Sequence, residues 1–223
     1  MARLARIVAP GYPHHVTQRG VRSLPIFRKD EDRRMYLEFM ARETRRLGVK
    51  ILAWCLMTNH VHLIAVPEDG KGLARAIGEA HKRYSRVRNF EEGVRGYLFQ
   101  GRFGSCVLDE RHLVAATRYV ERNPVRAGIV REPWAYPWSS AGYHAGERAE
   151  DVLVDERGLR GFSGSWKEYV GVAGKEDEEV NIRKATRAGR PLAEGRSLAR
   201  LERLTERDLR KGKPGRPRRD AGK

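Results

Sequence analysis

Two apolar segments separated by a two-residue turn constrain the fold of this chain most strongly. Residues Val49–Met57 form a mostly apolar run, and Thr58 and Asn59 follow it as a short turn. Residues His60–Val66 form a second run, which ends at Pro67. Strands joined by so short a turn pair side by side, so we predict a buried β-hairpin in this part of the chain.

Periodic segments on both sides of the hairpin extend this pattern. The sequence predicts a strand at His14–Arg19, a helix at about Asp30–Leu47, a second helix at about Gly72–Arg88 and a strand at Phe103–Leu108. The resulting order is strand, helix, strand, strand, helix, strand. We therefore expect an α+β fold with a ferredoxin-like, split βαβ antiparallel sheet that has its helices on one face.

A third helix is predicted after the last strand. Asp109 is a suitable N-cap for it, and Pro124 disfavours a helical conformation in Asn123, so the helix is expected to end there. It carries Tyr119 and is an addition to the ferredoxin-like order.

The composition changes after about Gly146, so we divide the chain into a domain at 1–146 and a basic extension at 147–223. The extension is highly charged, with weak apolar periodicity. Short helices are predicted around Trp166–Val170, Val180–Arg187 and Ser197–Asp208, and an extended Gly-Arg-Pro-Arg tail follows them.

The charge balance indicates an anionic partner. The 223 residues contain 45 Lys and Arg against 29 Asp and Glu, a formal net charge of +16. Nucleic acid is the usual partner for such a chain, and an acidic membrane surface is the alternative. No apolar run approaches the roughly 18 residues of a membrane span. The basic N-terminus lacks the apolar stretch of a signal peptide, so we expect a cytoplasmic, nucleoid-associated protein. Cys55 and Cys106 are interpreted as buried structural thiols.

His60 and His62 are the first candidates for a chemical role. Alternate residues of a strand point to the same face, so the two imidazoles project side by side with Val61 turned away. Two neighbouring imidazoles on a rigid strand are suitable ligands for a divalent metal. The alternative is a pair of ordinary polar residues on a solvated face of the sheet.

Tyr119 and Asn123 are the second pair of candidates. They are four residues apart, so they lie one turn apart on the same face of the third helix. Asn123 offers a carbonyl oxygen to a metal, and Tyr119 offers a phenol. The alternative is that Tyr119 is a core aromatic and Asn123 a C-terminal cap.

Several longer motifs resemble those of the single-tyrosine HUH transposases of insertion sequences, and more closely the REP-associated tyrosine transposases. The resemblance covers nearly the whole chain in the family's order. The matching segments are His14–Gly20, Met57–Ile64, Gln100–Phe103, Tyr119–Gly128, Pro137–Ser140, Arg187–Leu192 and Gly215–Arg218.

This resemblance implies a role for each candidate. His60, His62 and Asn123 match the metal ligands, with Mg²⁺ or Mn²⁺ as the ion, and Tyr119 matches the nucleophile. The implied activity is transposition by nicking and rejoining single-stranded or hairpin DNA from repeats, through a 5′-phosphotyrosine intermediate. The alternative is a protein that keeps the fold and recognises repeat hairpins without cutting them. The sequence leaves open whether the protein is a monomer or a homodimer.

Basic and aromatic side chains are candidates for gripping the DNA, because cations bind phosphates and flat rings stack on bases. A solvated basic face and core aromatics are the alternative. The basic candidates are Arg19, Lys82, Arg83, Arg86, Arg88, Arg102 and Arg126. Arg216 and Arg218 of the tail either lie in the minor groove or attract DNA by their charge alone. The aromatic candidates are Tyr97, Phe99 and Phe103.

Overall fold

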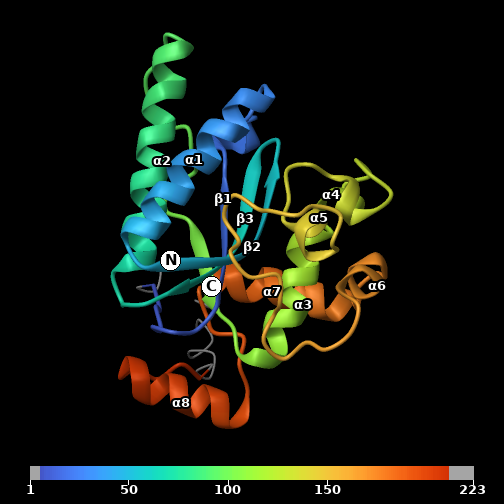
Figure 1. The fold of residues 1–223 in the computed structure, drawn as a ribbon. Coiled ribbons are helices and arrows are strands. Elements are labelled where there is room, and N and C mark those ends of the chain that lie inside the picture. Colours follow the sequence, from blue (N-terminus) through green and yellow to red (C-terminus); the bar gives the residue numbers. More distant parts are fainter. Residues whose placement is uncertain (1–5, 211–223) are drawn as a thin grey trace, which may run out of the picture.

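The computed structural model describes residues 6–210, and the Arg216–Arg218 tail motif lies outside them. A four-stranded sheet lies at the centre, with the strand order β2-β3-β1-β4 (Figure 1). Its strands are β1 (His14–Arg19), β2 (Val49–Met57), β3 (His60–Pro67) and β4 (Gly104–Val107). All neighbouring strands are antiparallel, and β2 and β3 form the predicted hairpin.

Helix α1 (Asp30–Arg46) joins β1 to β2, and α2 (Gly72–Glu91) joins β3 to β4. This order confirms the predicted split βαβ arrangement. At the end of α1, Gly48 has a φ of +60°, and a side chain there would also collide with Glu68. The left-handed conformation is least costly for glycine, which explains why the helix turns into β2 at this point.

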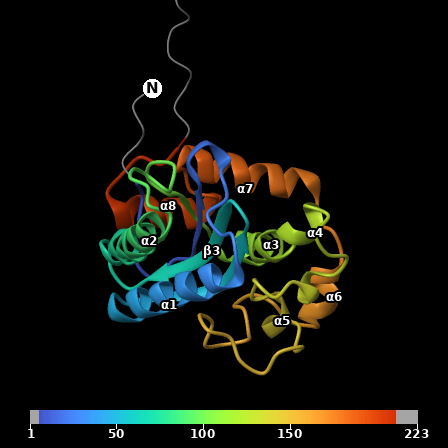
Figure 2. The same cartoon turned by 90° about the horizontal axis from the view of Figure 1, so that it is seen from above.

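The two faces of the sheet are covered by different helices. Leu63 and Ala65 of β3 pack with Tyr36 of α1 and Ile77 of α2 in one buried cluster. On the opposite face, Ile64 packs in a second cluster with residues of α3 (Glu110–Glu121) and α7 (Glu176–Ala188). Figure 2 shows α1 and α2 on one side of β3, with α3 on the other. The added third helix therefore closes the face that α1 and α2 leave open.

Helix α3 ends at Glu121, two residues before the predicted end near Asn123. Asp109 is its N-cap and accepts a hydrogen bond from the amide of His112 at 3.0 Å. Arg122 is its C-cap, and a new helical turn, α4 (Asn123–Arg126), begins at Asn123. Pro124 is acceptable there because the first turn of a helix does not need its missing amide proton.

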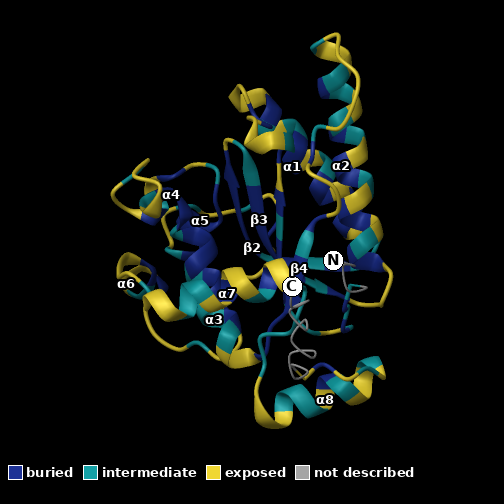
Figure 3. Ribbon diagram, turned by 180° about the vertical axis from the view of Figure 1, so that it is seen from behind, coloured by how far each residue is buried: buried dark blue, intermediate teal, exposed yellow. Residues whose placement is uncertain are grey.

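The part of the chain after residue 146 contains the three predicted helices. They are α6 (Trp166–Gly171), α7 (Glu176–Ala188) and α8 (Gly195–Thr205). Helix α7 packs on α3 and β4, and a parallel bridge joins Leu108 to Leu192. The burial colours of Figure 3 show α7 beside the sheet and the outer side of α8 exposed. The division of the chain at residue 146 stays a prediction.

The remaining described elements are short: η1 (Val21–Ser23), η2 (Pro133–Ala135) and α5 (Ala141–His144). Cys55 and Cys106 are both buried and free, as expected for structural thiols. Within residues 6–210, no helix is long and apolar enough to cross a membrane.

Candidate active site

His60 and His62 open strand β3 and point to the sheet face that α3 covers. Across the sheet, His60 pairs with Arg19 and His62 pairs with Thr17. The ring centroids of the two histidines are 5.0 Å apart, with the rings nearly perpendicular. His62 is buried, whereas His60 is partly exposed, so the pair lies where the covered face of the sheet meets solvent.

Asn59 fixes the orientation of the His60 ring. The Asn59 side-chain amide donates to the carbonyl of Ser23 at 3.1 Å, which leaves its oxygen to face His60 Nδ1 at 2.6 Å. An amide oxygen only accepts, so Nδ1 carries the proton and Nε2 keeps a free lone pair. Burial, with smaller contributions from Arg19 and Arg126, lowers the pKa of His60 from 6.5 to about 4. A neutral imidazole with a bare Nε2 is the form that binds metals.

His15 of β1 is a third histidine in this site, and it was not among the residues predicted from the sequence. Its Nε2 lies 2.9 Å from His62 Nδ1, and the two rings stack with centroids 5.1 Å apart. Burial lowers the pKa of His15 to about 3, and it lowers that of His62 well below 6.5. The ferredoxin-like order places β1 beside β3 and so indicates that His15 lies near the histidine pair. Only the register of the two strands shows that it contacts His62.

Tyr119 lies directly against this histidine group. Its ring meets His62 edge to face at a centroid distance of 5.6 Å, and it meets His15 in the same way at 5.7 Å. The side chain is only 3% exposed, and its hydroxyl receives a hydrogen bond from Arg126 Nη2 at 3.4 Å. The structure thus brings the predicted nucleophile and the predicted histidine pair into one cluster.

Asn123 lies one turn beyond Tyr119, at the start of α4. Its amide nitrogen donates to the carbonyls of Tyr119 and Val120 at 2.9 and 3.2 Å, so its oxygen points away from the helix. That oxygen accepts a hydrogen bond from Arg126 Nη2 at 2.6 Å. A carbonyl oxygen has two lone pairs, and one remains for another partner. The role of Asn123 as a metal ligand stays a prediction.

The donors of this site fit a divalent metal. Neither His60 Nε2 nor His62 Nε2 has a hydrogen-bond partner among residues 6–210, and both histidines are held neutral. Metal-binding histidines usually bond through their second nitrogen to a fixed partner, as both do here. The described part of the chain has no group of three or more His, Cys, Asp or Glu arranged around a metal. A metal would therefore depend on the two imidazoles and on neutral oxygen ligands.

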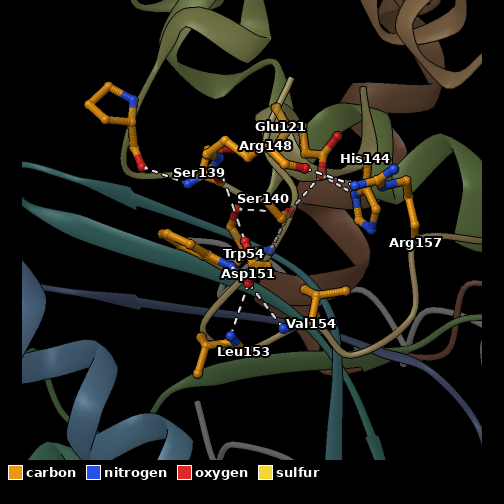
Figure 4. A network of polar contacts seen from close by, with 12 residues as sticks. Trp54, Glu121, Ser139, Ser140, His144, Arg148, Asp151, Leu153, Val154 and Arg157 are labelled. Atoms are coloured by element: carbon orange, nitrogen blue, oxygen red, sulfur yellow. Dashed lines mark hydrogen bonds and ion pairs between the residues drawn. The ribbon is translucent and has the colours of Figure 1, made fainter. Parts of the chain in front are cut away.

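A buried polar network anchors the end of α3 that carries Tyr119 (Figure 4). Glu121 Oε1 accepts hydrogen bonds from Ser140 Oγ and His144 Nδ1, both at 2.6 Å, and Oε2 accepts from Trp166 Nε1 at 2.8 Å. Ser140 in turn accepts a hydrogen bond from the amide of Trp54 in β2 at 3.0 Å. The network joins α3 to β2, α5 and α6, and it gives the Pro137–Ser140 motif a structural role.

Three residues proposed from the sequence as DNA contacts are buried, which favours the alternative of a structural role. Arg88 is only 5% exposed and forms a buried ion pair with Asp32 at 2.8 Å, so its charge is not available to a phosphate. Phe99 and Phe103 are buried in the core cluster beneath α1 and α2. Burial of their apolar rings removes surface from water and lowers the free energy, which explains why they do not lie on the surface. Tyr97, by contrast, is 89% exposed.

The other basic candidates differ in their availability. Arg19, Arg86 and Arg102 are exposed and have no ion pair among residues 6–210, and Arg19 lies beside His60. Lys82 and Arg83 form ion pairs with Glu79 and Glu43, and Arg126 pairs with Glu179 at 3.0 Å. Of these candidates, Arg19 and Arg126 therefore have a direct link to the histidine group.

Known proteins share this fold. The family described as IS200-like transposases matches residues 12–123, which include His15, the histidine pair and Tyr119. A search of curated proteins found no match. Among solved structures, a REP-associated tyrosine transposase bound to a REP hairpin is similar, with a TM-score of 0.57 and 18% identity. The similarity covers 74% of this chain and 97% of that one, and at this identity it shows a shared fold.

Proposed function

The chain belongs to the IS200-like transposases, and from this membership we propose that Tyr119 is the nucleophile with which it breaks and rejoins single-stranded DNA. The observation that carries the proposal is the edge-to-face contact between Tyr119 and His62. A phenol attached to a rigid helix, beside two neutral imidazoles with free lone pairs, is what a metal-assisted phosphoryl transfer requires.

His60 Nε2 and His62 Nε2 would hold the metal, with the Asn123 oxygen as third ligand. When bound, a divalent ion would withdraw charge from the scissile phosphate and orient it. Mg²⁺ prefers oxygen ligands, so two imidazoles favour Mn²⁺ in purified protein, whereas the abundance of Mg²⁺ favours it in the cell.

The covalent step would be an exchange of esters. The Tyr119 oxygen bonds to phosphorus, the bond from phosphorus to the 3′-oxygen breaks, and that oxygen gains a proton while the phenol loses one. The products are a 5′-phosphotyrosine and a free 3′-hydroxyl. Because the phosphodiester energy is conserved in the tyrosine ester, a 3′-hydroxyl can reverse the step without ATP.

The proposed substrate is hairpin-bearing repetitive DNA. The similar solved structure is described with a REP hairpin, and the net charge of +16 suits a polyanion. Such a substrate would place the protein at the nucleoid in the cytoplasm, as a monomer or a homodimer.

The test is a cleavage assay on hairpins taken from the DNA that flanks the protein's own gene. Wild-type protein with Mn²⁺ is expected to nick these strands and to leave a covalent protein–DNA adduct that survives denaturing electrophoresis. Tyr119→Phe is expected to lose the adduct and to keep hairpin binding. An adduct formed by Tyr119→Phe would show that another residue is the nucleophile.

One observation favours a second candidate, a protein that recognises repeat hairpins without cutting them. Tyr119 is nearly fully buried, and Arg126 contacts both its hydroxyl and the oxygen of Asn123. If wild-type protein binds hairpins tightly but forms no adduct with any divalent ion, this second function replaces the first.

A further inference from the structure

A chain of three hydrogen-bonded side chains runs from helix α7 to the histidine pair. Thr186 Oγ1 lies 2.7 Å from His15 Nδ1, and His15 Nε2 lies 2.9 Å from His62 Nδ1. All three side chains are buried, with exposed fractions of 2%, 1% and 5%. Water therefore does not compete for these bonds, and the partners themselves decide where each proton lies.

The contacts of Thr186 assign its single hydroxyl proton to Ile182, because a carbonyl oxygen can only accept, whereas an imidazole nitrogen can also donate. Thr186 Oγ1 donates to the carbonyl of Ile182 one turn earlier in α7, at 2.8 Å. The Cys106 thiol lies 3.2 Å from the same oxygen, and donates to it once the hydroxyl proton faces Ile182. The hydroxyl oxygen then acts as an acceptor towards His15, because it has no second proton to donate.

The direction of this bond decides which nitrogen carries the proton in His15 and, in turn, in His62. His15 Nδ1 carries the proton that faces Thr186, so neutral His15 has a bare Nε2. That nitrogen accepts a proton from His62 Nδ1, so neutral His62 keeps its lone pair on Nε2. The opposite direction of donation would place a proton on His62 Nε2 and block it as a ligand. Thr186 therefore selects between a form of His62 that binds a metal and one that does not.

We propose that Thr186, acting through His15, is a positioning residue that holds His62 in its metal-binding tautomer. The proposal rests on the proposed metal-dependent function and extends the site to a residue beyond the segment that the family match covers. It complements Asn59, which fixes His60 in the same tautomer from the other side of the pair.

The first test reads the tautomer in metal-free protein, by nitrogen NMR of ¹⁵N-labelled histidines. Wild-type His62 is expected to show a protonated Nδ1 and a bare Nε2. Thr186→Val, which keeps the shape but removes the oxygen, is expected to shift His62 towards a mixture of tautomers. Thr186→Ser keeps the hydroxyl and is expected to restore the wild-type spectrum.

Thr117→Val is the matched control, because Thr117 is a buried threonine whose hydroxyl has no hydrogen-bond partner among residues 6–210. It makes the same chemical change without touching the histidines and is expected to leave the His62 spectrum unchanged. A purely structural role for Thr186 would lower the stability of Thr186→Val but would not move the proton on His62.

The second test is a calorimetric titration of the same four proteins with Mn²⁺. Loss of an outer partner of a metal ligand typically weakens binding by about 10- to 100-fold, which is the loss expected for Thr186→Val but not for Thr186→Ser. A protonated His62 Nε2 in the wild type, or an unchanged tautomer in Thr186→Val, would overturn the proposal. Wild-type protein that binds no Mn²⁺ would overturn the metal-dependent function instead, while the NMR result would still support the hydrogen-bond chain.

Discussion

The guanidinium of Arg126 lies over the ring of Tyr119, with its central carbon 4.6 Å from the ring centroid. Arg126 also donates to the oxygen of Asn123 and pairs with Glu179 of α7. One planar cation thus touches both the proposed nucleophile and the proposed third ligand. A lysine has no planar group with which to make these contacts together.

We therefore predict that Arg126→Lys slows formation of the covalent adduct by about tenfold or more, because misplaced reacting groups lose rate steeply. Hairpin affinity should change little, since the positive charge remains. Arg118→Lys is a close control: Arg118 lies 4.3 Å from the Tyr169 ring centroid and pairs with Glu178 at 3.0 Å. Equal adduct rates in the two variants, followed on denaturing gels, would contradict a specific role for Arg126.

The carboxylate of Glu121 should dominate the stability of the region behind Tyr119. Glu121→Ala leaves the buried donors of His144 and Trp166 without their acceptor, whereas Ser140 Oγ can still donate to the carbonyl of Trp54. A buried donor without an acceptor costs about 1–3 kcal/mol, so we expect the free energy of unfolding to fall by about 2–6 kcal/mol in urea titrations. Glu147→Ala, which removes a surface ion pair with Lys167, is expected to change the free energy of unfolding far less, because water screens exposed charges. Similar losses in the two variants would contradict this assignment.

Stability should fall in acid because of buried neutral histidines, and His81 offers a test outside the site. Burial lowers the pKa of His81 from 6.5 to about 3, and its Nε2 lies 3.0 Å from the Tyr36 hydroxyl. Between these two pKa values the unfolded chain binds a proton that the folded chain excludes. The stabilisation is therefore present above pH 6.5 and is lost as pH falls towards 3, by up to about 1.4 kcal/mol per pH unit.

His81→Gln has no titrating group but still offers an acceptor to Tyr36. Urea titrations at pH 7.5 and 5.0 should show a smaller loss of stability for this variant than for the wild type. The other buried histidines titrate in both proteins, so the difference isolates His81. Parallel losses would mean that His81 is protonated in the folded protein.

Two exposed aromatic rings should contribute to DNA affinity. Phe90 and Tyr97 are 86% and 89% exposed, and the segment that carries Tyr97 is bonded through Leu98 and Gln100 to Val21 and Arg19. Arg19 pairs with His60, so the segment that carries Tyr97 lies at the same end of the sheet as the histidine pair.

Phe90→Ala and Tyr97→Ala should each weaken binding of single-stranded hairpin DNA by about 1–3 kcal/mol, the usual worth of stacking one base on a ring. Fluorescence anisotropy measures the change. Val172→Ala, at an apolar residue that is 66% exposed, is the control and should leave affinity unchanged. Unchanged affinity in both aromatic variants would place the DNA elsewhere on the surface.

The order of the elements was predictable from sequence, because the spacing of apolar residues and the lengths of the segments distinguish helices from strands. The β2–β3 hairpin has apolar runs on both sides of a two-residue turn, and α1 ends at a glycine with positive φ. Asn123 was predicted to end a helix, but it begins the short helix α4, because proline is acceptable in the first turn of a helix.

The neighbours of the histidine pair were harder to predict. His60 and His62 are two residues apart, and Tyr119 follows from the motif that carries it, but His15 and Thr186 reach the site only through strand register and helix packing. The burial of Arg88, Phe99 and Phe103 was equally hard to predict, because nothing in their local sequence distinguishes a surface cation or ring from a buried one.

The hydrogen bond between His15 and Thr186 also limits when the site can form during synthesis. The two residues are 171 positions apart in the chain. At synthesis rates of about 5–20 residues per second, the ribosome adds Thr186 roughly 10–30 s after His15. A nascent chain that already displays its histidines and its tyrosine therefore lacks the last partner of the site, and the hydrogen-bonded group can assemble only after α7 has been synthesised.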